Sequence, residues 1–188
     1  MAKDLSRLLV VDLEATCWDK NDTATPKEQQ VHEIIETGHA FLELAPQIRI
    51  GLCGSLKVRP EKSRISEYCT NLTGWTQESI DSGMMLRDAC KNLADMGSKN
   101  MTWASWGDYD RRQLMTECQD KHLDYPMSWT HINLKNLFAI MYGLNKEVGV
   151  GKALNILGWE FEGRQHNGGD DARNIARIAA KMFEKIKV

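Results

Sequence analysis

The chain has 188 residues, of which 42% are hydrophobic and 27% are charged, which suffices for one sizeable core and is small for two. Its net charge of −2 excludes a large positive field over the whole molecule, so an anionic ligand has to be met by a local patch or by bound cations. No apolar stretch approaches the roughly 20 residues that span a bilayer, and the first residues lack the apolar segment of a signal peptide. The sequence therefore predicts a single domain over residues 1–188, in the cytoplasm and without a membrane partner, and it leaves the oligomeric state open.

Three strands in succession are predicted first, and strands separated by helices follow. Residues 8–14 form an almost uninterrupted apolar run, which is typical of a central strand. Further strands are predicted at residues 33–44, 49–58, 101–105 and 129–133. Helices are predicted as short segments within residues 66–83, capped by Ser66, Thr73 and Ser79, and at residues 86–96, 110–122, 134–142, 152–157 and 171–187, with Gly143 and Gly158 ending the two short ones. This order predicts an α/β domain whose mixed five-stranded sheet carries helices on both faces.

Two acids, Asp12 and Glu14, lie at the end of the first apolar run. Because side chains alternate along a strand, the two carboxylates project from the same face. Side-by-side carboxylates repel one another unless one is protonated or a cation lies between them. Mg²⁺ or Mn²⁺, which prefer oxygen ligands, would resolve this conflict. The pair alone is equally compatible with a solvated strand end, because Asp-x-Glu is too short a pattern to be specific.

The start of the last predicted helix offers two further acids, Asp170 and Asp171. Asp171 lies four residues before Ile175 and shares the apolar stripe, whereas Asp170 aligns with Asn174 on the solvent face or serves as the N-cap. An inward-facing acid requires a partner, so Asp171 is the better candidate ligand. The alternative is a first-turn acid that complements the helix dipole, which explains its charge but not its inward position.

His166 precedes two glycines at this loop-to-helix junction. A single histidine is more often a structural residue than a catalyst. Beside a metal-binding acid, however, a side chain that titrates near neutral pH is a candidate general base.

A middle segment, "GDYDRRQL", again contains two competing acids. Asp110 is in phase with Leu114 on the apolar stripe of the following helix, whereas Asp108 precedes the helix as a natural cap. We favour Asp110 as the inward-facing acid.

Together these motifs resemble those of the DEDDh 3′–5′ exonucleases, a group of the DnaQ-like superfamily. The resemblance rests on Asp-x-Glu in the first strand ("VVDLEATCW"), on Tyr-Asp before a middle helix ("GDYD") and on His-x4-Asp at the last helix ("HNGGDD"). Two further segments, "HEIIETGHAFLEL" and "EYCTNLTGWTQESID", are similar to the second strand and the substrate loop of the Eri-type exoribonuclease branch, which includes histone-mRNA 3′ exonucleases. The similarity runs from about residue 8 to residue 182.

This resemblance implies a ribonuclease-H-like fold and a site for two divalent cations, Mg²⁺ or Mn²⁺. The implied metal ligands are Asp12, Glu14, Asp110 and Asp171; Glu14 also counts as catalytic, with His166 as the general base. Four carboxylates around two cations are able to carry out in-line displacement at phosphorus. Their positive charge also explains how an acidic protein accepts a polyanion.

The implied function is a metal-dependent 3′–5′ exonuclease that releases nucleoside 5′-monophosphates from single-stranded 3′ ends, with RNA favoured over DNA. The backbone at Ala15 and Thr16 is expected to contact the terminal nucleotide. Trp75 resembles the position of an apolar wedge that stacks on the terminal bases, and a packed core tryptophan is the alternative.

Two other functions stay open at this stage. A proofreading-type 3′–5′ exodeoxyribonuclease would carry the same acids, because recognition of the 2′-hydroxyl depends on geometry. A non-catalytic nucleic-acid-binding module would need a degenerate site, and the presence of all five candidate side chains counts against it.

Overall fold

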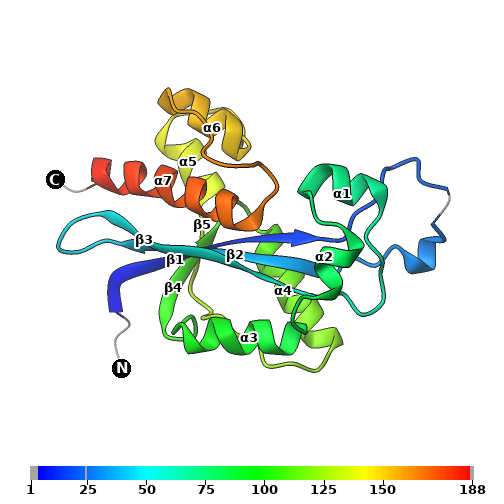
Figure 1. The fold of residues 1–188 in the computed structure, drawn as a ribbon. Coiled ribbons are helices and arrows are strands. Elements are labelled where there is room, and N and C mark those ends of the chain that lie inside the picture. The colour runs from blue at the N-terminus through cyan, green and yellow to red at the C-terminus, as the bar shows by residue number, and fades with distance from the viewer. Residues whose placement is uncertain (1–3, 24, 187–188) are drawn as a thin grey trace.

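A five-stranded sheet in the order β3-β2-β1-β4-β5 organises the computed structural model, which describes residues 4–23 and 25–186 (Figure 1). The strands are β1 (Asp4–Ala15), β2 (Ile34–Glu43), β3 (Arg49–Lys57), β4 (Met101–Ser105) and β5 (His131–Asn133). β1 pairs antiparallel with β2 and parallel with β4, so the sheet is mixed. Within the described residues, no helix has the length and apolarity that a bilayer crossing requires.

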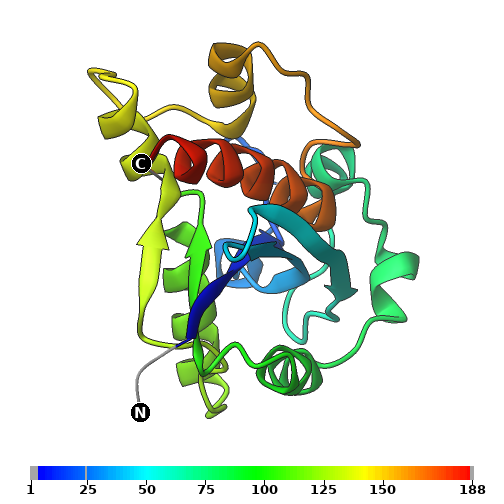
Figure 2. The same ribbon diagram turned by 90° about the vertical axis from the view of Figure 1, so that its left-hand side faces the viewer.

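Helices cover both faces of this sheet. They are the 3-10 helix η1 (Lys27–Gln29) and the α-helices α1 (Glu67–Thr73), α2 (Gln77–Asp81), α3 (Leu86–Asp95), α4 (Tyr109–Asp120), α5 (Leu134–Met141), α6 (Val150–Leu157) and α7 (Gly168–Ile186). Figure 2 shows α7 crossing one face and α3 lying on the other. The predicted α/β architecture, a mixed five-stranded sheet with helices on both faces, is confirmed.

The central position of β1 follows from its sequence. Leu8 and Val10 pack into the core beneath α7, whereas Leu9 and Val11 pack into the core against α3 and α4. All four are at most 1% exposed, as expected for a strand that is covered on both faces. This buried strand carries Asp12 and Glu14 at the point where it leaves the core.

Some predicted helix caps differ from those observed. Ser66 caps α1 as predicted, by accepting a hydrogen bond from the Cys69 backbone N–H. Thr76, rather than Thr73 or Ser79, caps α2, and Ser79 is its partner in a capping box. Thr73 is instead the buried last residue of α1, where its hydroxyl donates to the Cys69 carbonyl.

The glycines predicted to end α5 and α6 do so, with φ of 63° at Gly143 and 73° at Gly158. α7 begins at Gly168, three residues before its predicted start, because the Asn167 side chain accepts the Asp170 backbone N–H. The predicted last residue of this helix, Lys187, lies outside the described residues.

The solvent-facing position predicted for Asn174 is wrong. Its side chain is fully buried, accepts the Glu162 N–H, and donates to the Glu162 and Asp170 carbonyls. Asp170 is not the N-cap, because α7 already begins at Gly168; its carboxylate accepts the Arg164 N–H from the loop before α7. A polar helix face in the sequence therefore does not show whether solvent or a folded-back loop covers that face.

α7 starts in direct contact with the backbone of β2. A Cβ atom on Gly38 would overlap the carbonyl group of Gly168, so the two backbones meet at a distance that only glycine allows. This contact sets the height of the first turn of α7 above β1 and β2. The position of Asp171, three residues into α7, depends on it.

Gly38→Ala is expected to lower the free energy of unfolding by about 1–3 kcal/mol or more, because the new methyl group has to displace backbone. Gly51→Ala is the matched control, since a Cβ there would lie an ordinary 3.4 Å from the Phe41 Cβ. Urea unfolding of both variants measures the difference. Equal stability of the two variants would contradict the close contact.

Candidate active site

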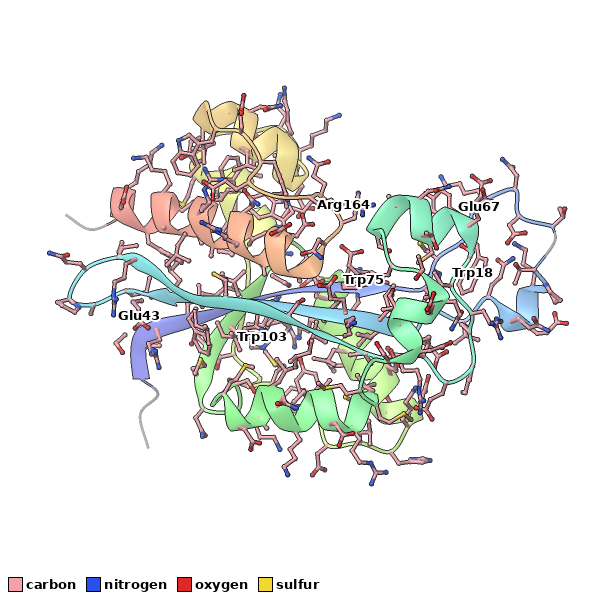
Figure 3. The ribbon with its side chains drawn as sticks, viewed as in Figure 1. Trp18, Glu43, Glu67, Trp75, Trp103 and Arg164 are labelled. Atoms are coloured by element: carbon pink, nitrogen blue, oxygen red, sulfur yellow. The ribbon has the colours of Figure 1, made fainter. Side chains whose placement is uncertain are left out.

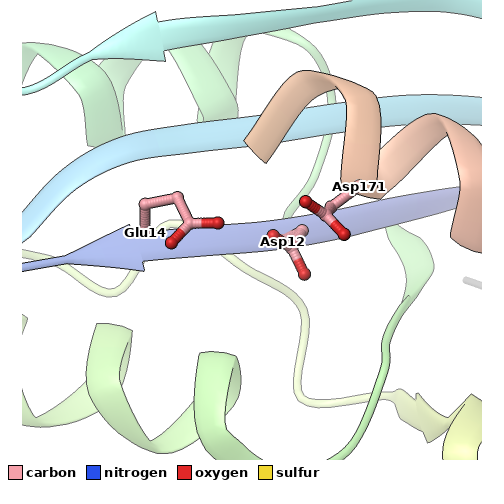
Figure 4. Close-up of side chains that lie close together, drawn as sticks. All are labelled: Asp12, Glu14 and Asp171. Atoms are coloured by element: carbon pink, nitrogen blue, oxygen red, sulfur yellow. The ribbon is translucent and has the colours of Figure 1, made fainter. Parts of the chain in front are cut away.

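Three carboxylates meet where β1 leaves the core. Asp12 and Glu14 project from one face of β1, and Asp171 descends from the first turn of α7 (Figure 4). One oxygen of each carboxylate lies within 4.8 Å of the others. The structure thus brings together acids that lie more than 150 residues apart in the sequence.

Asp110 approaches this group from α4. It is 5% exposed, and its Oδ1 accepts the Leu13 backbone N–H at 2.9 Å. Asp108, by contrast, is exposed and accepts a hydrogen bond from the Asn133 side chain. The structure therefore places Asp110, and not Asp108, beside the carboxylates of β1.

Burial and mutual repulsion perturb these acids. Burial, followed by the charges of Asp110 and Asp171, raises the pKa of Asp12 well above its ordinary value. Burial, followed by the charge of Asp171, raises the pKa of Glu14 to about 8. Burial also raises the pKa of Asp171 to about 7, against the opposing effect of the His166 and Asn167 main-chain N–H groups.

The donor set fits divalent cations. Asp171 Oδ2 is buried and has no hydrogen-bond partner among the residues that the structure describes. An oxygen-only set of neighbouring carboxylates is what Mg²⁺ and Mn²⁺ prefer, and a cation would remove the repulsion that the folded chain leaves uncompensated. Asp12, Glu14 and Asp171 form the centre of this site, with Asp110 next to it.

The acids line a cleft of about 390 Å³. The rest of its lining consists of Leu13, Trp106, Tyr109, Val150, Gly151, Phe161, Gln165 and His166. His166 is exposed and has a left-handed φ of 60°, which is uncommon for a residue with a side chain. Partial desolvation and the charge of Arg164 lower the pKa of His166, so its imidazole is neutral at neutral pH.

The three predicted substrate contacts lie outside the cleft lining. The Thr16 backbone N–H and its hydroxyl bond to the Glu33 and Val31 carbonyls, and the Ala15 carbonyl accepts the Cys69 thiol. Trp75 is half-buried. Their contact with substrate stays a prediction.

Sequence reasoning missed Glu36, which lies directly opposite Glu14 in the β1–β2 register and is fully buried. The signal was the same one that identified Asp12 and Glu14, an acid within an apolar strand. Tyr109 and Trp106 were also missed; both line the cleft, and Tyr109 is the neighbour of Asp110 in "GDYD".

Without divalent cations, stability is expected to fall as pH rises from about 4 to about 8. The unfolded acids ionise near pH 4, whereas the folded Asp171 and Glu14 hold their protons to about pH 7 and 8, so stability present at low pH is lost through this window. Thermal unfolding in EDTA from pH 5 to 8 should show the loss, Mg²⁺ should reverse it, and Asp171→Asn should flatten it. Identical profiles for wild type and variant would contradict the repulsion.

Comparison with known proteins agrees with this geometry. The profile of the exonuclease family RNase_T matches residues 9–179. The 3′–5′ exonuclease Snipper of Drosophila melanogaster is 31% identical, over 94% of this chain and 69% of its own length. Human 3′–5′ exoribonuclease 1 is also 31% identical over 94% of this chain, which spans about half of that protein, 52%.

Among solved structures, the nuclease domain of 3′hExo, a DEDDh family member bound to rAMP, superimposes with a TM-score of 0.84 and 28% identity. The match covers 98% of this chain and 95% of that domain. The predicted ribonuclease-H-like fold and the predicted family are confirmed. The chain belongs to the RNase_T family of exonucleases, and it resembles the Eri-type 3′–5′ exoribonucleases within it.

Proposed function

We propose that the chain hydrolyses single-stranded RNA from its 3′ end, with Mg²⁺ or Mn²⁺, and releases nucleoside 5′-monophosphates. The observation that carries this proposal is the cluster of Asp12, Glu14 and Asp171 in one cleft with His166. A structural relative with 28% identity and a TM-score of 0.83 is described as recognising the 3′ end of a histone mRNA stem-loop. That likeness supports RNA and the 3′ end.

The carboxylates of Asp12, Glu14, Asp110 and Asp171 would hold the cations. When bound, divalent cations activate the attacking water and stabilise the leaving oxygen during phosphodiester hydrolysis. The Leu13 N–H fixes Asp110 against β1, so the ligands from β1 and α4 keep a constant spacing. The first turn of α7 adds Asp171 from above.

His166 acts as the general base. Its exposed imidazole lines the cleft beside the acids and is neutral at neutral pH, so it is able to take the proton of the attacking water. The cleft lining also includes the rings of Trp106, Tyr109 and Phe161, on which a base or ribose of the terminal nucleotide would pack.

End-labelled RNA tests the direction of cleavage and the cation requirement. With Mg²⁺, 5′-labelled RNA should shorten stepwise while 3′-labelled RNA yields a labelled mononucleotide at once, and EDTA should abolish both. Asp12→Ala should be inactive. Shortening from the 5′ end, or activity that survives Asp12→Ala, would overturn the mechanism, and preference for single-stranded DNA would assign the chain to exodeoxyribonucleases instead.

Removing the base should lower kcat by about 10²–10⁴-fold in His166→Ala. His122→Ala is the matched control, because His122 is another exposed histidine with a left-handed φ, 52°, outside the cleft.

The pH dependence gives a second readout for His166. Its pKa is lowered from the ordinary value near 6.5, so wild-type kcat/KM should fall on acidification with a midpoint below that value. At saturating Mg²⁺ the residual activity of His166→Ala should lack this limb. A limb that persists unchanged in the variant would exclude His166 as the base.

A further inference from the structure

Glu36 is a buried acid that the proposed chemistry does not use. It is 0% exposed and faces Glu14 across the β1–β2 pair. Its charge is one of those that raise the pKa values of Asp12, Glu14 and Asp171. Because the charge of Glu36 opposes ionisation of the candidate metal ligands, its presence requires an explanation beyond packing.

The hydrogen bonds of Glu36 distinguish it from the candidate ligands. Its Oε2 accepts the Trp75 indole N–H at 2.8 Å and the Gly168 backbone N–H at 2.9 Å. Its Oε1 accepts the Asn167 side-chain amide at 3.4 Å. Donors from the protein thus occupy both oxygens, whereas Asp171 Oδ2 has no such partner within the described residues.

These donors belong to two segments that are far apart in the sequence. Gly168 is the first residue of α7, where a carboxylate satisfies an otherwise unpaired N–H and complements the helix dipole. Trp75 lies between α1 and α2. One oxygen atom, Oε2, therefore joins the start of α7 to the segment that holds Trp75.

A second contact joins the same two segments. The Arg164 guanidinium lies against Gly74, so closely that a Cβ on Gly74 would overlap it, and Gly74 has a left-handed φ of 82°. Figure 3 labels Arg164 and Trp75, the residue that follows Gly74. Arg164 lies two residues before His166. The loop that carries His166 thus rests on the Gly74–Trp75 segment.

We propose that Glu36 is a positioning residue, which rests on the proposed exonuclease function. Its carboxylate fixes the start of α7, and with it His166 and Asp171, relative to β1. Through the shared Oε2 it also makes the placement of these residues depend on the Trp75 side chain. Trp75 would then affect the chemical step through Glu36 as well as any contact with RNA.

Three variants separate this role from packing. Trp75→Phe keeps an aromatic ring but removes the N–H donor. Glu36→Gln keeps an oxygen that is able to accept from both Trp75 and Gly168. Glu36→Leu removes all three acceptor contacts. Glu33→Gln is the matched control, because Glu33 is equally buried at 1% exposure but binds the backbone of residues 61–63 and Lys121.

The assay compares a single-stranded RNA oligonucleotide with the p-nitrophenyl ester of uridine 5′-monophosphate, a phosphodiester too short to reach beyond the cleft. Glu36→Leu is expected to lower kcat on both substrates by about 10²-fold, the size expected for a misplaced catalytic group. Glu36→Gln should restore most of this loss. Trp75→Phe should lower kcat on the short ester as well as on RNA. If Glu36→Leu does not fold, the other two variants still decide the matter.

Several results would overturn the proposal. If Trp75→Phe changes only the KM for RNA, Trp75 is a substrate contact only. If the Glu36 variants lose no more kcat than Glu33→Gln does at a matched melting temperature, the role of Glu36 is structural.

Mn²⁺ binding adds a readout without turnover. Glu36→Gln should bind Mn²⁺ like wild type, and a loss of affinity of about tenfold or more would make Glu36 part of the metal site. Wild type that cleaves neither substrate would refute the proposed function itself, whereas active wild type with unaffected variants would refute only the role of Glu36.

Discussion

Repulsion between buried carboxylates is the constraint on which this structure depends. Carboxylate oxygens of Asp12, Glu14 and Asp171 lie within 4.8 Å of one another at the edge of the core. Burial further raises the free energy of ionising these groups. The surrounding fold has to hold them in place against that repulsion. It does so with a strand whose apolar residues are covered on both faces and with a helix that is packed against β2 through glycine backbone.

Among the acids in and around the site, hydrogen bonding separates Glu33 and Glu36 from Asp171. Glu33 and Glu36 accept N–H donors on both carboxylate oxygens and connect loops to the sheet. Asp171 keeps a buried oxygen without a partner among the described residues, beside Asp12 and Glu14. The N–H donors on Glu33 and Glu36 stabilise the fold, whereas the unpartnered Asp171 oxygen beside two further carboxylates is available to bind a cation. Burial alone therefore does not identify a ligand.

The parts of the site that local periodicity determines could be predicted from the sequence. Alternation along β1 placed Asp12 and Glu14 on one face, and helical phase placed Asp171 inward. Tertiary partners could not be predicted in this way. Asn174 was expected in solvent because helical phase does not show that the loop at Glu162 folds back over it, and the interaction of Glu36 with Trp75 joins residues 39 positions apart.

The two halves of the site are positioned in different ways, one by local geometry and the other by tertiary contacts. β1 presents its acids by strand geometry alone, so their spacing changes little with the rest of the chain. His166 and Asp171 lie on a loop and a first helical turn, whose position comes from Gly38, Glu36 and Asn167. Half of the site is thus fixed by secondary structure and half by residues that do not line the cleft. Residues of the second kind, and not the acids themselves, decide whether the two halves meet at the distance that catalysis requires.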